Sequence, residues 1–203
     1  MTRRNDRHKD DTQAVMVAMT ALSSLTRNVK NQDAAMAGNA AELVVARLKD
    51  YSTSPRICHF AVGVLSNLVF KSTKYKAVAS KAGAVRAVID TMGTHLFEVA
   101  VQLAGVSFFR NFTASSEVHR TEVGNKGGIL SIVDGLREHQ TAEDLYFQGC
   151  GALNNLCRES LPLNKAAAKA ARTSEVVGAV AESFDPTSPT RQAIMELIAR
   201  LVK

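Results

Sequence analysis

The sequence repeats itself at an interval of 44 residues, and this interval most constrains what the chain can fold into. Asn67, Asn111 and Asn155 are each 44 residues apart, in segments that read FAVGVLSNLVF (60–70), LAGVSFFRNFT (103–113) and QGCGALNNLCR (148–158). With slips of one residue, the same period reaches VAMTALSSLTR at 17–27 and AIMELIARLVK at 193–203. An apolar pair three residues apart recurs in all of these segments, so the chain is built from one repeated unit.

The stretches between these segments repeat as well. KAGAVRAVIDTM at 81–92 matches NKGGILSIVDGL at 125–136, with Gly83 and Gly127 again 44 residues apart. Apolar residues spaced three and four apart indicate helices, and no alternating pattern indicates a strand. Because glycine tolerates the dihedral angles of a sharp turn, each unit is predicted to hold a short helix, a glycine break, a medium helix, a turn and a long helix. The helices predicted for one unit are 116–126, 128–139 and 142–158.

A three-helix unit of this length resembles the armadillo repeat, and GVLSNL, GGILSIVDGL and GCGALNNL are close to that family's pattern. The resemblance implies an all-α chain folded as a right-handed α-solenoid, in which neighbouring units bury apolar faces that no unit can bury alone. After a charged N-terminal arm at 1–10, it covers a single domain at 11–203, made of a partial unit (11–28) and repeats 29–72, 73–115, 116–160 and 161–203. A HEAT-like stack, with a similar period and two helices per unit, is the alternative left open.

Composition and cysteine content favour an intracellular globular protein. The three cysteines lie in apolar runs, and the charged start has no apolar signal region behind it, so reduced thiols in the cytoplasm or nucleus are expected. No apolar run approaches the ~20 residues of a membrane span. The formal charge of +6 lies partly in the arm and is otherwise scattered. Nucleic acid is a disfavoured partner, because no basic stripe is interleaved with stacking aromatic residues.

Catalysis, cofactors and metals are not expected. The five histidines show no metal-ligand spacing, and Cys150 and Cys157 lie two helical turns apart, too far to share one metal ion. GCGALN at 149–154 lacks the preceding strand and the third glycine of a dinucleotide fingerprint. The cysteines are therefore interpreted as buried packing residues, and the chain as a non-enzymatic protein without a cofactor or a metal.

Protein or peptide binding is the function that the repeat favours. In the armadillo stack that this sequence resembles, the long third helices line the concave groove, and Asn67, Asn111 and Asn155 match the asparagine-ladder position. The resemblance implies that these side chains bind the main chain of a partner segment, since an amide offers both donors and an acceptor. A solvated surface asparagine is the alternative at each single position. Ser24 and Arg200 stand at this position in the flanking units, which limits the ladder to three repeats.

The residues around the ladder describe the rest of the predicted groove. In nuclear-import adaptors of the family, a tryptophan lies four residues before the ladder asparagine, but this chain has Gly63, Ser107 and Gly151 there. Lysine-rich signals would therefore lose their cation–π walls. Helical spacing adds further groove residues, which make the groove basic toward the N-terminal end and acidic toward the C-terminal end: Arg56, Lys71, Asp144, Gln148 and Glu159. The predicted ligand is an extended or helical segment of mixed charge on a floor of small residues.

A structural role is the second interpretation. The last helix, RQAIMELIARLVK at 191–203, is still apolar where the sequence ends, and the sequence begins partway through a unit. Both features favour a scaffold, or a fragment of a longer solenoid, that self-associates end to end through its C-terminal helix.

Residues 143–149, EDLYFQG, resemble the cleavage sequence of a viral protease that is used to remove affinity tags. The repeat runs through this string, because Asn111 and Asn155 are as far apart as Asn67 and Asn111. Gly149 also falls where the other units carry alanine or glycine. The string is therefore predicted to be native helix, with Gly149 allowing close approach to a neighbouring helix.

Overall fold

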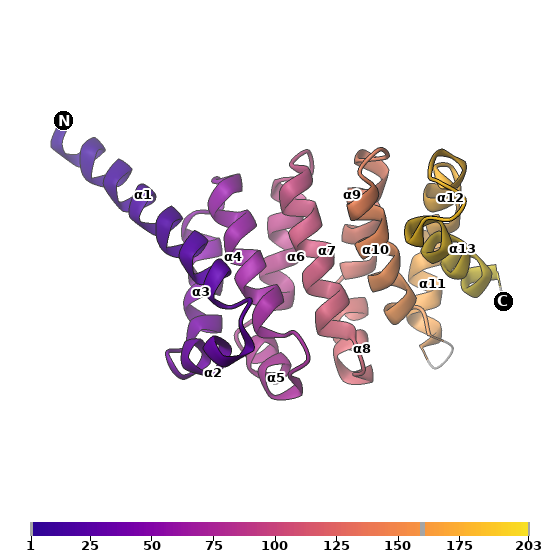
Figure 1. Cartoon of the computed structure of the whole chain (residues 1–203), viewed down its shortest axis with the longest axis horizontal. Coiled ribbons are helices and arrows are strands. Elements are labelled where there is room, and N and C mark those ends of the chain that lie inside the picture. The colour runs from indigo at the N-terminus through magenta and orange to yellow at the C-terminus, as the bar shows by residue number, and fades with distance from the viewer. Residues whose placement is uncertain (1, 159–160, 203) are drawn as a thin grey trace.

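The computed structural model describes the backbone of residues 2–158 and 161–202 and the side chains of residues 11–158 and 161–202. Within these ranges the regular structure is entirely helical, which confirms the all-α prediction. The helices stand side by side in a single elongated stack, with the two ends of the chain at opposite ends of it (Figure 1).

The helices fall into three sets that recur along the chain. The short first helices are α2 (Val29–Ala37), α5 (Thr73–Lys81), α8 (Glu117–Asn125) and α11 (Pro162–Ala170). The second helices are α3 (Ala40–Asp50), α6 (Ala84–Thr94), α9 (Gly128–Glu138) and α12 (Thr173–Gly178). The long third helices are α1 (Thr2–Leu25), α4 (Pro55–Leu68), α7 (Val99–Thr113), α10 (Glu143–Leu156) and α13 (Pro189–Val202). The bounds of α8, α9 and α10 agree with the predicted helices to within two residues.

The backbone turns between the first and second helices at a left-handed residue in every unit. Gly83 and Gly127 have φ values of 82° and 86°, as the predicted glycine breaks require. Asn39 and Arg172 occupy the equivalent turns with φ values of 56° and 55°, although neither is glycine. The turn geometry is therefore a property of the repeat, and glycine only makes it easier to adopt.

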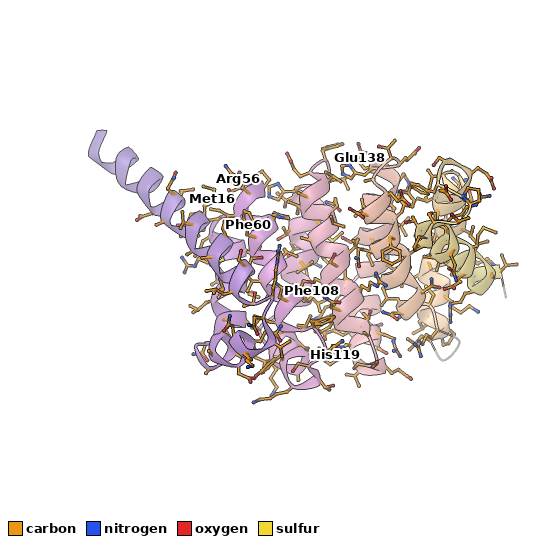
Figure 2. All side chains as sticks on the ribbon, in the orientation of Figure 1. Met16, Arg56, Phe60, Phe108, His119 and Glu138 are labelled. Carbon is orange, nitrogen blue, oxygen red and sulfur yellow. The ribbon has the colours of Figure 1, made fainter. Side chains whose placement is uncertain are left out.

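The core is continuous along the stack, because each third helix packs against the next one. At its centre the fully buried rings of Phe108 and Phe112 stack with centroids 5.2 Å apart (Phe108 is labelled in Figure 2). Small residues allow this close approach: a Cβ atom added at Gly105 would lie 2.3 Å from Met92 Sδ, and one at Gly149 would lie 2.9 Å from Leu136 Cδ2. The role predicted for Gly149 is confirmed.

Residues 143–149 lie inside α10, which is continuous from Glu143 to Leu156. Leu145 and Tyr146 are fully buried, and Gly149 is buried against Leu136. The string that resembles a protease site is thus part of the solenoid's own packing.

The two ends of the stack depart from the regular pattern. Helix α1 runs from Thr2 to Leu25, so the backbone at 2–10, within the expected arm, is continuous with the helix expected at 11–28. In the last unit, α12 ends at Gly178 and is followed by a 3-10 turn at Ala181–Ser183, after which Phe184 packs on the ring of Tyr146. The predicted start of the final helix is confirmed, because Ser188 Oγ accepts a hydrogen bond from the Arg191 backbone N–H at 3.1 Å and Pro189 is the first helical residue.

None of the helices in the described part of the chain is both long and apolar enough to cross a membrane.

Candidate binding face of the third helices

The third helices α1, α4, α7, α10 and α13 form one side of the stack, which we call the third-helix face (Figure 1). The predicted ladder asparagines lie near the C-terminal ends of the three central helices of this face, and each is half-buried. The first helices gather at the edge marked by His119 in Figure 2, and the turns between second and third helices lie at the edge marked by Glu138.

Each ladder asparagine donates its side-chain amide to the preceding third helix. Asn67 Nδ2 lies 3.0 Å from the backbone oxygen of Ser23, and Asn111 Nδ2 lies 3.2 Å from that of Ser66. Asn155 Nδ2 makes the same bond to Arg110 O at 3.2 Å. The asparagines therefore link neighbouring units, a role that sequence reasoning did not assign to them.

The carbonyl oxygens of these amides have a different environment. Among the side chains and backbone groups that the structure describes, none donates a hydrogen bond to Oδ1 of Asn67, Asn111 or Asn155. Each of these half-buried side chains thus keeps an acceptor on the third-helix face, while its amide nitrogen is already hydrogen-bonded.

The positions one turn before the ladder lie against the preceding helix. A Cβ atom added at Gly63 would lie 3.2 Å from Ser23 Oγ, and one at Gly151 would lie 2.7 Å from Arg110 Nε. Ser107 is half-buried between them. A larger residue at 63 or 151 would meet a side chain of the neighbouring helix, which would then have to shift.

Arg110 is the residue of this face that sequence reasoning missed. Its guanidinium carbon lies 4.6 Å from the centroid of the Phe147 ring, and Nη1 donates to Gln148 Oε1 at 2.9 Å. It therefore covers Gly151 and joins α7 to α10. A signal was present in the sequence, since the residue before each ladder asparagine is polar: Ser66, Arg110 and Asn154.

The structure separates the charged residues predicted for the groove. Arg56 and Asp144 are exposed in the first turns of α4 and α10, near the edge that Glu138 marks, and Arg56 lies one turn from Phe60 (Figure 2). Lys71 is exposed at the other edge, just after α4, where φ is 55°. Gln148 is half-buried and bonded to Arg110. Glu159, which helical spacing also places near the groove, lies outside the described residues.

A cavity of about 430 Å³ opens beside Asn111, where α4, α5 and α7 meet. It is lined by Phe70, Lys71, Thr73, Lys76, Asn111, Ala114 and Ser115. Other cavities, of about 400 and 340 Å³, lie between successive second helices and do not include a ladder asparagine. The cavity beside Asn111 thus joins the ladder to a basic surface.

A second series of polar residues closes the ends of the third helices. These residues are 44 apart in the first helices, are buried, and donate to backbone oxygens at or just beyond the ends of third helices: Gln32 to Thr26, Lys76 to Ala114, Arg120 to Thr113 and Asn164 to Leu156. The terminal carbonyls of a helix have no partner within the helix. The series satisfies them from the neighbouring element, and its spacing could have revealed it in the sequence.

The three cysteines are free and fully buried, which confirms their interpretation as packing residues. Burial raises the pKa of Cys58 to about 11 and that of Cys150 and Cys157 to about 12. A thiol held in its protonated form is a poor nucleophile and a poor metal ligand. In the described part of the chain, no three His, Cys, Asp or Glu side chains are grouped closely enough to hold a metal ion.

Comparison with known proteins identifies the fold. No protein-family model matches the sequence, and no curated protein matches it. Among solved structures, the chain is similar to an armadillo-repeats-only protein from Plasmodium falciparum, with a TM-score of 0.75 and 20% identity over 92% of this chain and 79% of that one. It is also similar to an engineered protein, with a TM-score of 0.53 and 14% identity over 92% and 90% of the two chains. The predicted armadillo-repeat solenoid is confirmed as the fold.

Proposed function

We propose that this armadillo-repeat solenoid is a non-enzymatic protein-binding module that holds an extended or helical segment of a partner protein along its third-helix face. The observation that carries the proposal is the spacing of Asn67, Asn111 and Asn155 at one equivalent position of three successive helices, with each Oδ1 left as an acceptor. An extended main chain presents N–H groups at a regular interval, so a row of acceptors can align it without requiring particular side chains.

The side chains between the ladder positions favour contact with a segment rather than with a small ligand. Ser107 is a small side chain on α7, while the half-buried Arg110 and Phe147 form a cation–aromatic contact next to Gly151. Guanidinium and aromatic groups are enriched in the energetically important parts of protein interfaces. Lysine-rich import signals are a poor fit, because Gly63, Ser107 and Gly151 supply no aromatic walls. The buried, unpaired cysteines are in keeping with an intracellular location, in the cytoplasm or the nucleus.

The test blocks the face without removing the asparagine bonds. Ser107→Arg adds a long side chain to the third-helix face, and Leu130→Arg adds the same group to α9, where Leu130 is exposed on the second helices. In affinity capture followed by mass spectrometry, partners retained by the wild type should be lost with Ser107→Arg and kept with Leu130→Arg. Equal retention by both variants would contradict the proposal, provided that both unfold at the wild-type temperature.

A second candidate function is a scaffold that assembles end to end. On α13, at the end of the stack, Met195 and Val202 are 53% and 79% exposed, and α1 at the other end exposes Val17 and Leu25 by 59% and 56%. Contact between these ends would bury apolar side chains that single solenoids leave in water. Sedimentation velocity over a range of concentrations distinguishes the two candidates, since end-to-end assembly predicts a rising mass that Met195→Asp reverses.

A further inference from the structure

The cavity at the junction of α4, α5 and α7 carries two lysines and no carboxylate among its lining residues. Lys71 is an exposed residue of this lining, with Nζ 5.1 Å from the centroid of the Phe70 ring. Phe70 itself is 41% exposed and forms an apolar wall. Asn111 lies in the same lining, so the cavity and the central ladder position are one continuous surface.

Lys76 is the unusual member of this lining, because only 4% of it is exposed. Its Nζ donates to the backbone oxygen of Ala114 at 2.5 Å, which uses one of the three donors of an ammonium group. No carboxylate of the described residues lies within ion-pair distance of it. Buried charges in proteins are normally paired with an opposite charge, whereas this ammonium group donates to a backbone carbonyl.

A second buried cation reinforces the positive charge. Arg120 is 5% exposed and donates from Nε to Thr113 O at 3.0 Å, next to the residue whose oxygen Lys76 binds. Burial lowers the pKa of Lys76, and the nearby charge of Arg120 lowers it further. Two like charges therefore lie close together at the end of α7, an arrangement that an anion would stabilise.

We propose that this cavity binds the carboxylate of an aspartate or glutamate side chain in the partner segment, while Asn111 Oδ1 accepts a main-chain N–H of the same segment. The proposal rests on the proposed function and specifies the chemistry of its ligand. Lys71 and Lys76 bind the carboxylate from the rim and from the interior, and Phe70 packs against the methylene groups of the acidic side chain. The partner segment is therefore acidic at the residue that meets this cavity.

A peptide carboxylate fits the lining better than a phosphate group or a lipid headgroup does. The lining offers two ammonium groups and no guanidinium fork, and planar forks are what favour bidentate binding of phosphate. The side-chain Oδ1 of Asn111 can accept a hydrogen bond from a peptide main-chain N–H, a group that a free phosphate or a lipid headgroup does not have. A single acidic side chain on an extended peptide meets both features at once.

The experiment follows the amide resonances of the isotope-labelled 203-residue chain during titration with a peptide of alternating glutamate and serine. Two matched peptides replace every glutamate by glutamine or by phosphoserine. We expect saturable shifts at residues 70–76 and 111–115 with the glutamate peptide and much smaller shifts with the glutamine peptide. Equal shifts with the glutamine peptide, binding of the phosphoserine peptide alone, or no localised shifts with any peptide would each overturn the inference.

Variants locate the effect within the cavity. Lys76→Met removes the buried charge while keeping a side chain of similar length, and it should weaken the glutamate peptide about tenfold. Lys71→Gln, at an exposed position, should weaken binding without affecting the fold. Lys81→Met, at an exposed position of α5, the helix that carries Lys76, should leave binding unchanged. Unchanged affinity in both Lys71→Gln and Lys76→Met would overturn the inference. The proposed function would survive that outcome, because its own test compares Ser107→Arg with Leu130→Arg.

Discussion

Asn111 on α7 donates its side-chain amide to the backbone oxygen of Ser66 on α4, at 3.2 Å. The same nitrogen lies 3.1 Å from Ser66 Oγ. Asn67 and Asn155 repeat this relationship with the helices before them. The position predicted to bind a ligand is therefore also a link between units. A ligand that accepted from Nδ2 would compete with the solenoid's own hydrogen bonds, whereas one that donates to Oδ1 would not.

Asn111→Ala should reduce the free energy of unfolding by about 1 kcal/mol, because it removes a partly buried hydrogen bond between two units. Asn125→Ala, at an exposed position of α8, is the matched control and should stay within about 0.5 kcal/mol of the wild type. Urea denaturation followed by circular dichroism measures both. Equal stability of the two variants would show that the Asn111 bond contributes nothing in solution. A triple substitution of the ladder would thus change stability together with binding.

Much of the fold could be predicted from the sequence, because each unit repeats the same local signals. Gly83 and Gly127 indicated the turns between first and second helices, because these turns require a positive φ that glycine adopts readily. The 44-residue spacing of Asn67, Asn111 and Asn155 indicated which residues occupy equivalent positions in the third helices. What could not be predicted is the last unit, where Gly178 ends a helix early. The repeat period does not indicate that α12 ends at Gly178, or that Phe184 then packs on Tyr146.

The contacts between units were harder to predict, because spacing places a side chain on a face but does not name its partner. His95 and His139 are 44 residues apart, and each places Nε2 near a backbone oxygen of the preceding unit, Ser52 O at 2.7 Å and Leu96 O at 2.8 Å. Their spacing in the sequence indicates that they are not metal ligands, but it does not indicate which oxygens they contact. The buried series that includes Lys76 was missed for a similar reason, since a lysine in a helix ordinarily indicates a solvated face.

Gly105→Ala should lower the free energy of unfolding by about 1–3 kcal/mol, because the new methyl group would overlap Met92, which is 1% exposed and has little room to move. Gly93→Ala is the matched control, since Gly93 lies in α6 with nothing within 4 Å of an added Cβ. Because alanine has a higher helix propensity than glycine, Gly93→Ala should raise the free energy of unfolding by up to about 1 kcal/mol. Thermal unfolding of the two variants should therefore shift in opposite directions, and a shift in the same direction would refute the close packing of α7 on α6.

The three thiols should resist alkylation in the folded protein and react when it unfolds. Burial raises the pKa of Cys150 from its ordinary value of 9.0 to about 12, and Cys58 and Cys157 shift in the same direction. When the pH exceeds the ordinary thiol pKa, the unfolded chain loses protons that the folded chain keeps. The thiols' contribution to the free energy of unfolding is therefore unchanged below pH 9.0 and falls as the pH rises toward 12. Iodoacetamide labelling with mass spectrometry checks the first point.

Denaturation between pH 8 and pH 11 checks the second point, with the triple Cys→Ala variant as the control for other titrating groups. Its stability should decline less steeply with pH than that of the wild type. Equal slopes, or rapid alkylation of the native thiols at pH 8, would mean that α4 and α10 open to solvent far more readily than their burial implies.

The native protein should resist the viral protease whose cleavage sequence resembles residues 143–149. Proteases bind extended, accessible substrates, whereas this string is helical and Leu145 and Tyr146 are fully buried. Cleavage between Gln148 and Gly149 requires α10 to open, so its rate should follow the small population of unfolded chain and rise steeply in urea near the unfolding midpoint. A synthetic peptide of residues 139–152 should be cut readily in the same buffer, which controls for the aspartate at position 144 and for loss of protease activity in urea. Cleavage of the native protein at the rate of the peptide would be incompatible with a continuous α10, and with the placement of Asn155 on the third-helix face that depends on it.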